Sequence, residues 1–421
     1  MSIECKFEGM QEQDGYKYFK LSSKDGRIGL FTDDFLIENM KNGNLIVSNL
    51  RISNGKIIQK TDKDISIENN IKVFNKYRNF RNVTSNLVYY EHEVMIGKKI
   101  YFLQITQDSM LLYIPDDIVN EVAWGDTYFD LMSNTIDKGD EEIEGIISAY
   151  ISMTQVKRLK IIGGRNLIDC SEMFMSCQLN LLDLTDFDTS NVNNMSYMFK
   201  NAQINKILFG DFDTSKVVSM IEMFNDFNGV DLDLSSFDTS NVSFMGEMFC
   251  NCQIEHLFNI VNFDTSHVTN MEGMFEDCFV VGDVDFSNFD TSNVVSMQRM
   301  FAGSKIRVLN LLSFDTSKVI DMRRMFSGCE VSVLNVNSFN TMNTRYFYGM
   351  FMNCDIQLLD LDNFNFSSAE ELHSMFMNSY ITTLKIKGKG IDNSEKVLTD
   401  VFRDSMIVEL LTESNKLKDI L

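Results

Sequence analysis

The feature that most constrains this chain is a Met-Phe pair that recurs every 25 or 26 residues. Nine copies are intact and a tenth is altered to Val401-Phe402; the intact ones begin at Met173, Met198, Met223, Met248, Met274, Met300, Met325, Met350 and Met375. Self-similarity at such a period predicts a solenoid, because each repeat buries its apolar face only by stacking on its neighbours. The sequence therefore constrains architecture more tightly than function.

Each repeat divides into an expected strand, a turn and an expected helix. The strand is indicated by an inward line of spacing L-x-x-L-x-L-x-x-F, as in Leu179, Leu182, Leu184, Phe187 and in Val281, Val284, Phe286, Phe289. After Asp188-Thr189-Ser190, the residues Val192, Met195, Met198, Phe199 and Ala202 follow at offsets typical of one side of an α-helix. We therefore expect an α/β solenoid of about ten strand-turn-helix repeats, with a parallel sheet on its concave side.

Three segments are predicted along the chain. Residues 1–139 lack the repeat and are expected to form a smaller α+β domain, with a helix over 35–41 and a hairpin that turns at Asn54-Gly55. A second hairpin over 93–106, a strand over 110–114 and a short helix from Pro115 are also expected.

Residues 140–155 have an acidic first turn and an apolar face, so we expect a helix that caps the array. Residues 156–421 form the predicted solenoid with its C-terminal cap. Such capping keeps the apolar edge of a terminal repeat from solvent.

The formal net charge of −22 argues against direct binding to nucleic acid or to an anionic membrane, because both need a basic surface. A basic protein is the better expected partner. No apolar signal-peptide segment and no apolar run long enough for a transmembrane helix is found in this chain, so we expect a cytoplasmic protein.

The repeat resembles that of the BspA-like branch of leucine-rich repeats, a bacterial and protist family. The residues Leu232-Asp233-Leu234-Ser235-Ser236-Phe237-Asp238-Thr239-Ser240-Asn241-Val242, followed by Met245, Met248, Phe249 and Cys252, carry the resemblance, which covers about residues 156–405. It implies a leucine-rich-repeat solenoid and, for many members, a role as a surface adhesin or host-interaction protein.

Two repeated polar positions have competing interpretations. Cysteine occupies one slot at Cys177, Cys252, Cys278, Cys329 and Cys354, but other copies carry Ala202 or Ser304 there, so small buried thiols are favoured over metal ligands or disulfides. An aspartate column comprises Asp188, Asp213, Asp238, Asp264, Asp290 and Asp315, continued by Asn340 and Asn365. Capping of the following turn is favoured over calcium binding, because neutral Asn serves equally at two copies.

No catalytic motif is found. The four histidines are scattered, and nucleophile-elbow, phosphate-loop and zinc-protease signatures are missing. We therefore expect no catalytic residue, no metal site, no cofactor and no enzymatic activity.

The strand positions that face outward are the candidate partner-binding site. These polar, largely acidic residues are Asp183, Asp231, Asp233, Asp283, Asp285, Asn310, Asn335, Asp360 and Asp362, and the strand after them turns basic at Lys385, Lys387 and Lys389. The structural interpretation is that strand positions in contact with solvent must be hydrophilic whether or not they bind a partner. The functional interpretation is that an acidic face attracts a basic protein through its electrostatic field.

The primary hypothesis is a non-enzymatic protein that binds, and inhibits or sequesters, a basic protein such as a nucleic-acid-handling factor. The alternative is the surface adhesin or host-interaction protein that the resemblance implies. A hydrolase or nuclease within residues 1–139 is a third hypothesis, which no motif favours.

Overall fold

The computed structural model comprises two compact units, residues 1–93 with 99–114, and residues 94–98 with 115–421. The structure describes residues 3–13, 16–23, 28–31, 33–42, 45–47, 50–53, 56–59, 88–93, 99–106, 108–114, 147, 151, 155–392, 398 and 400–421. The predicted boundary at residue 139 and the predicted helix from Pro115 lie outside these residues. Within the described part of the chain, none of the helices has the length and apolar character that a membrane span requires.

The first unit contains small sheets and one helix. Strands β1 (Ile3–Gln13), β2 (Tyr16–Ser23), β3 (Ile28–Phe31) and β4 (Leu45–Val47) form a sheet of order β3-β2-β1-β4, and α1 (Asp33–Lys41) precedes β4. Phe7, Leu21, Leu36, Val47 and Leu50 form its core. The helix predicted over 35–41 is confirmed as α1.

Two antiparallel arrangements complete this unit. Strands β5 (Leu50–Ser53) and β6 (Lys56–Gln59) form the hairpin predicted at Asn54-Gly55. Strands β7 (Val88–Glu93), β8 (Lys99–Thr106) and β9 (Ser109–Ile114) pair in sequence order, so the second hairpin begins earlier than residue 93.

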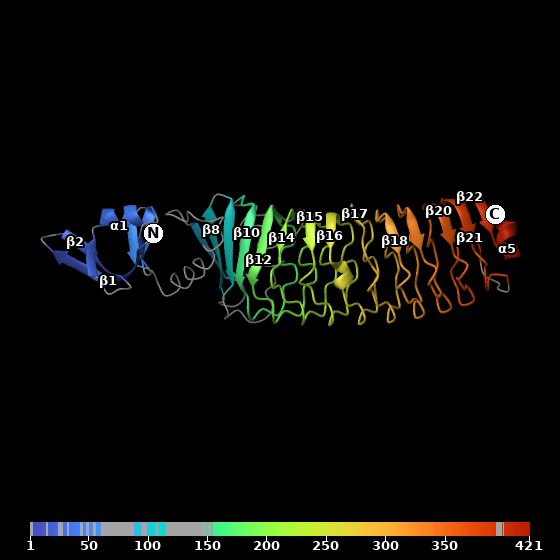
Figure 1. The fold of residues 1–421 in the computed structure, drawn as a ribbon, viewed down its shortest axis with the longest axis horizontal. Coiled ribbons are helices and arrows are strands. Elements are labelled where there is room, and N and C mark those ends of the chain that lie inside the picture. The colour runs from blue at the N-terminus through green and yellow to red at the C-terminus, as the bar shows by residue number, and fades with distance from the viewer. Residues whose placement is uncertain are drawn as a thin grey trace, which may run out of the picture. The chain divides into compact units, whose positions relative to one another are not determined.

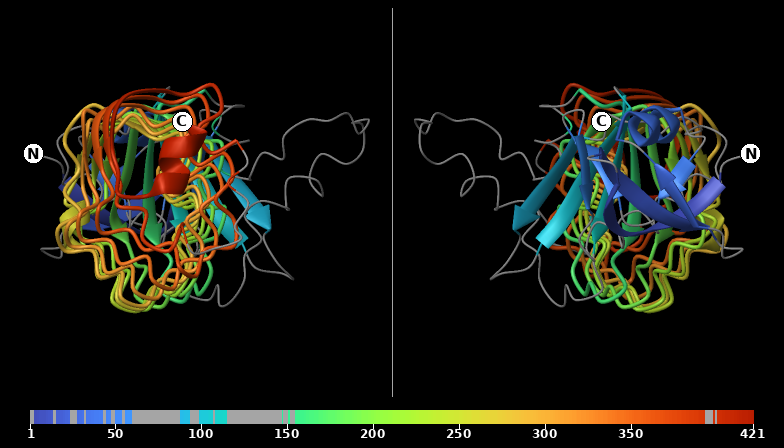
Figure 2. Two further views of the ribbon diagram at one scale, coloured as in Figure 1. Left: turned by 90° about the vertical axis from the view of Figure 1, so that its right-hand side faces the viewer. Right: turned by 90° about the vertical axis from the view of Figure 1, so that its left-hand side faces the viewer.

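The second unit is a parallel β-solenoid with one coil for each copy of the repeat. Its elements are β10 (Arg158–Gly163), β11 (Gln178–Leu179), β12 (Leu181–Phe187), β13 (Gln203–Ile204), β14 (Ile207–Leu208), β15 (Asn228–Asp233), β16 (Gln253–Phe258), η1 (Ile260–Asn262), β17 (Phe279–Val280), β18 (Val308–Asn310), β19 (Val333–Asn335), β20 (Asp355–Asp360), β21 (Tyr380–Lys385), β22 (Met406–Leu411) and α5 (Asn415–Ile420). Strands of successive coils pair in parallel, as in β15 with β16 and β20 with β21. The coils lie side by side along one axis in Figure 1, and they overlie one another in the end-on views of Figure 2.

The helix predicted in each repeat is wrong. Residues 196–201 form consecutive turns instead, and Asn194 forms an isolated bridge. The N–H groups of Met198, Lys200 and Ala202 donate to the carbonyl three residues earlier, and those of Met195, Tyr197, Phe199 and Asn201 donate to the next coil, at 2.8–3.0 Å. No backbone group is left for the i→i−4 bonds of a helix.

Two columns of left-handed residues make these turns. Each coil has a positive φ at the third residue of two turns, as at Tyr197 (φ 60°) and Asn201 (φ 55°). The second column contains only residues that tolerate this conformation, namely Ser176, Asn201, Asp226, Asn251, Asp277, Gly303, Gly328, Asn353, Asn378 and Asp404. This column is the sequence signal that distinguishes turns from a helix.

Helices are also excluded by the spacing of the core. The phenylalanines of the Met-Phe pairs stack face to face on neighbouring coils, with ring centroids 5.2 Å apart for Phe199 and Phe224 and 5.3 Å for Phe249 and Phe275. Packed helix axes need about 8–10 Å. The turn side of the coils therefore repeats at nearly the spacing of the strands, about 4.8 Å. A sheet is concave when the opposite side of the solenoid is more widely spaced, so the expected concave curvature has no physical basis here.

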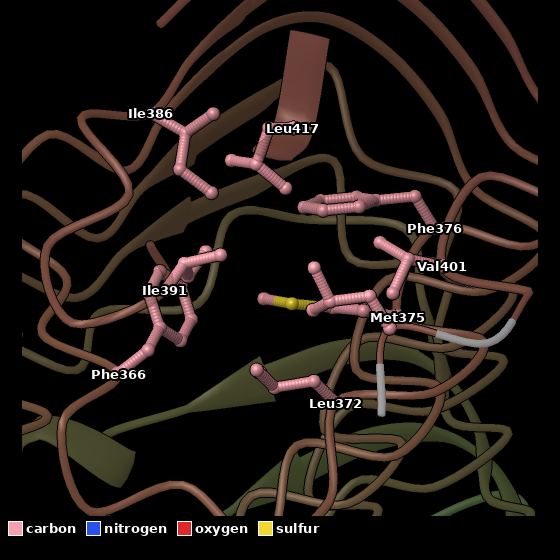
Figure 3. Close-up of a pocket in the computed structure, with 9 residues that line it drawn as sticks. Phe366, Leu372, Met375, Phe376, Ile386, Ile391, Val401 and Leu417 are labelled. Carbon is pink, nitrogen blue, oxygen red and sulfur yellow. The ribbon is translucent and has the colours of Figure 1, made fainter. Parts of the chain in front are cut away.

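The ends of the core are covered differently. In the predicted capping helix over 140–155, Ile147 and Ile151 are helical and buried, and Gln155 N–H donates to Ile151 at 2.8 Å. At the other end, α5 buries Leu417 over a small apolar cavity (Figure 3). The cavity is lined by Phe366, Leu372, Met375, Phe376, Ile386, Ile391, Leu398, Val401 and Leu417. Its volume of about 10 Å³ hardly admits one water molecule, so it is a packing defect.

We expect Phe249→Ala to destabilise the protein by about 3–5 kcal/mol, because it opens a hole in the middle of the phenylalanine stack. Urea unfolding followed by circular dichroism measures the change. Phe244→Ala is the matched control, because Phe244 is exposed at the neighbouring turn and its loss costs at most about 0.5 kcal/mol. Equal effects of the two substitutions would contradict the stacked core.

Candidate functional site

The predicted partner-binding residues lie on or directly after the strands of the second unit. Asp183 lies on β12, Asp231 and Asp233 on β15, Asn310 on β18, Asn335 on β19 and Asp360 on β20, while Asp283, Asp285 and Asp362 follow β17 and β20. We call the outward side of these strands the strand face.

The strand face is not a continuous acidic strip. In the sheet register, Asp183 lies beside Leu208, Asp233 beside Phe258 and Asp360 beside Lys385. The two asparagines Asn310 and Asn335 are direct neighbours. Apolar and basic residues therefore interrupt the acidic positions.

Asp183 has a structural role. The ammonium group of Lys160, on the preceding strand, lies 3.1 Å from the Asp183 carboxylate and 2.6 Å from that of Asp186, and it donates to the Thr185 hydroxyl at 2.8 Å. The Lys160 side chain is only 2% exposed. A buried cation requires such partners, so this carboxylate is committed within the protein.

Other candidate carboxylates face a cation one coil further on. Asp360 pairs with Lys385 at 3.6 Å and Asp362 with Lys387 at 3.7 Å. The basic strand predicted after the acidic positions thus neutralises them. Exposed pairs of this kind are weak, but they reduce the field that a partner meets.

Asp233 also serves the fold. Its carboxylate accepts from the Ser235 N–H at 3.0 Å and from the Asn259 side chain at 2.7 Å. Burial alone would raise the pKa of Asp233, but the hydrogen bonds from Asn259 and Ser235 outweigh it and hold the pKa below its ordinary value.

The most exposed acidic and apolar side chains of the strand face lie in a patch on and beside three neighbouring strands, β15 to β17. Four apolar side chains are exposed there, Val230, Phe258, Phe279 and Val281. Four carboxylates lie among them, Asp231, Glu255, Asp283 and Asp285. We call these eight residues the central patch.

The acidic residues of the central patch are solvent-accessible. The side chains of Asp231 and Asp283 are 45% and 72% exposed, and they contact His256 Nδ1 at 3.0 Å and the Arg307 guanidinium at 3.6 Å. Phe258 is 46% exposed, and its ring stacks on His256 with centroids 5.8 Å apart. Exposed aromatic rings are enriched in protein interfaces.

The sequence missed the apolar part of this patch. Phe258 occupies the outward position that is polar in most coils, which is a signal that could have been found. Val281 was predicted to face inward, and that prediction is wrong, because Val280 pairs with Ile254 and is buried while Val281 is 62% exposed. The cause is one extra residue between the inward positions Val280 and Val284.

The aspartate column caps turns, as predicted. The carboxylates of Asp188, Asp213, Asp238, Asp264, Asp290 and Asp315 each accept from the N–H of the serine two residues later, at 2.9–3.1 Å. Asn340 and Asn365 accept in the same way. In the described part of the chain, no group of three or more His, Cys, Asp or Glu side chains is arranged to hold a metal ion.

The cysteine slot is buried, as predicted. Cys252 and Cys278 lie on neighbouring coils with sulfur atoms 2.9 Å apart, and burial raises the pKa of the Cys252 thiol well above its ordinary value. Burial likewise raises the pKa of Cys250 to about 12. Such protonated thiols are poor nucleophiles at neutral pH.

Similarity to one protein family extends over more than half of the chain. A family model described as "Mycoplasma protein of unknown function, DUF285" matches residues 168–283 and again residues 280–388. The two matches together cover the greater part of the solenoid. No curated protein matches the chain. No solved structure matches it either.

The aspartate column predicts a pH dependence. Hydrogen bonds from Ser266, first from its side chain and then from its N–H, hold the pKa of Asp264 below its ordinary value. A lowered pKa in the folded state stabilises the protein above the ordinary pKa of about 4, and this stabilisation is lost as the pH falls through the folded value. We expect Asp264→Asn to be less stable than wild type at pH 7 and the difference to shrink towards pH 3.

Urea unfolding at pH 7, 5 and 3 measures this. The reverse change Asn340→Asp, at the equivalent position, is expected to gain pH dependence of the same sign but smaller size, because the residue two positions on is Met342, which donates its N–H but has no hydroxyl. A stability difference for Asp264→Asn that stays constant between pH 7 and pH 3 would refute the charge-assisted cap.

Proposed function

The chain belongs to the DUF285 family of Mycoplasma proteins of unknown function, and from this premise we propose that it is a non-enzymatic protein-binding protein. Its binding surface is the central patch of the strand face, and its partner is a basic protein. The observation that carries the proposal is the set of exposed apolar side chains, Phe258 above all, on neighbouring coils that also carry the accessible carboxylates Asp231 and Asp283.

The chemistry of the patch favours a cationic partner with an apolar anchor. A net charge of −22 attracts basic proteins over distances of about one Debye length, roughly 8–10 Å at physiological salt. Once contact is made, apolar side chains supply most of the affinity and the charged rim supplies specificity. The accessible carboxylates Asp231 and Asp283 of the central patch fit arginine or lysine side chains that flank an apolar residue of the partner.

This partner chemistry suggests inhibition or sequestration. A protein that handles nucleic acid exposes a basic surface for phosphates. If the central patch covers such a surface, nucleic acid is displaced. The solenoid itself needs no catalytic group, cofactor or metal for this role.

We also propose that the repeat is a BspA-like unit whose expected helix is replaced by turns. The phrase from Leu232 to Cys252 supports this, because it matches that family's consensus closely. The same resemblance favours a second candidate function, a surface adhesin. Protease treatment of intact native cells distinguishes the two candidates, because an adhesin is cleaved and an internal binding protein is not.

The charge of the patch is tested by replacing its accessible carboxylates. We expect the triple variant Asp231→Lys, Asp283→Lys, Asp285→Lys to lose the basic proteins that the wild-type protein retains from a native-cell extract, because it removes attraction and adds repulsion. Quantitative mass spectrometry of retained proteins at low and high salt is the measurement.

The matched control is Asp211→Lys, Glu413→Lys, Asp419→Lys, which changes the net charge equally at exposed residues outside the central patch. It is expected to keep the retained set. Loss of the same proteins by both triple variants would show that net charge alone acts. Retention by both would refute the proposed surface.

The apolar anchor is tested with Phe258→Ala. We expect the affinity for a retained basic protein to fall about tenfold or more, because truncation of an aromatic hot-spot residue costs roughly 1–2 kcal/mol or more. Isothermal titration calorimetry with that purified partner gives the constant. Leu312→Ala, at an exposed residue beyond β18, is the control, and an equal effect of the two would contradict the assignment.

A further inference from the structure

Strand β22 leaves an edge of the solenoid without a partner. It is the outer strand of the sheet β20-β21-β22, and among the described residues no strand pairs with its other side. An unpaired edge offers a row of N–H and C=O groups to another chain. Edges are usually protected by lysine, proline or a bulge, but Met406–Leu411 contains no lysine and no proline, and Glu409 is its one charged residue.

The side chains of β22 are also incompletely covered. Ile407 and Leu410 take the inward positions that Ile381 and Leu384 take one coil earlier, but they are half-buried while the earlier pair is fully buried. α5 seals the core with Leu417 and leaves these two partly open.

Outward residues enlarge this apolar surface. Met406 and Val408 are each 62% exposed, and Leu411 is exposed as well. Ile420 and Leu421, at the end of α5, are also exposed. Exposed apolar residues concentrated on one coil mark an interaction surface.

We propose that the edge of β22 pairs in antiparallel fashion with β22 of a second copy of this chain. The strand reads outward, inward, outward, outward, inward, outward, and this order is the same in both directions. A two-fold axis between Val408 and Glu409 therefore sets Ile407 against Leu410 of the second copy, and Met406 against its Leu411. Each pair faces the same side of the joined sheet, as antiparallel pairing requires.

Symmetry favours a second copy over an unrelated strand, because the order of inward and outward residues along β22 is the same in both directions. A two-fold interface closes at the dimer, whereas addition of a parallel strand to this edge would leave a new edge open. The central patch takes no part in this contact.

The central pair gives a test of register. In the proposed dimer, Val408 lies opposite Glu409 of the second copy, twice over by symmetry. Val408→Glu then sets like charges against each other, whereas Val408→Lys sets opposite charges together. Sedimentation velocity of the full chain over a range of concentrations measures the dimer dissociation constant.

We expect a wild-type dimer, a dissociation constant raised about tenfold or more in Val408→Glu, and a dimer retained in Val408→Lys. Val333→Glu, at an outward valine on β19 and not on the last coil, is the control and should leave the dimer unchanged. A monomeric wild type, an unaffected Val408→Glu, or equal weakening by Val408→Glu and Val408→Lys would overturn the proposal. Binding of a basic protein at the central patch is a separate readout, so either proposal can fail alone.

Discussion

The structure of the second unit depends on one constraint, the hydrogen bonds that the turn side makes between coils. On that side, alternate N–H groups such as those of Tyr197 and Phe199 donate to the next coil, and the groups between them close turns within their own coil. This arrangement needs a left-handed residue twice per coil, which costs about 1–2 kcal/mol for an ordinary L-residue. The cost is offset because a buried backbone group without a partner is more expensive. The turn side and the strand side then have nearly the same spacing between successive coils, and this spacing allows the phenylalanines to stack.

The core and the order of the repeats could be predicted from the sequence, but the conformation of the turn side could not be predicted from apolar spacing. Val192, Met195, Met198, Phe199 and Ala202 are all buried as expected, because a pair of tight turns and a helix bring the same offsets to one side. The information that separates them lies in polar residues, in the column of Asn, Asp, Ser and Gly that includes Asn201 and Gly303. The spacing of apolar residues does not reveal the backbone dihedral φ. The core pattern alone therefore favoured an α-helix, which is the commoner structure.

The candidate site shows a similar limit. The sequence predicted correctly which aspartates lie on or after the strands, because alternation along a strand is local. Their electrostatic state depends on the neighbouring coil, about 25 residues away, and there Lys160, Lys385 and Lys387 neutralise part of the acidic set. The exposed Val281 was missed for a related reason, since one inserted residue changes which side chain faces out. The surface that remains is smaller than the predicted strip and more apolar, and this combination suits a protein partner.

The central physical claim is that every coil turns without an α-helix and that the coils repeat at nearly one spacing on the strand side and the turn side. Far-ultraviolet circular dichroism of the intact chain tests this most directly, because ten helices would dominate the spectrum. The account predicts a spectrum of β-structure and turns, with a small helical contribution that includes α1, α5 and the helical residues Ile147 and Ile151. A strong double minimum typical of α-helix would contradict it.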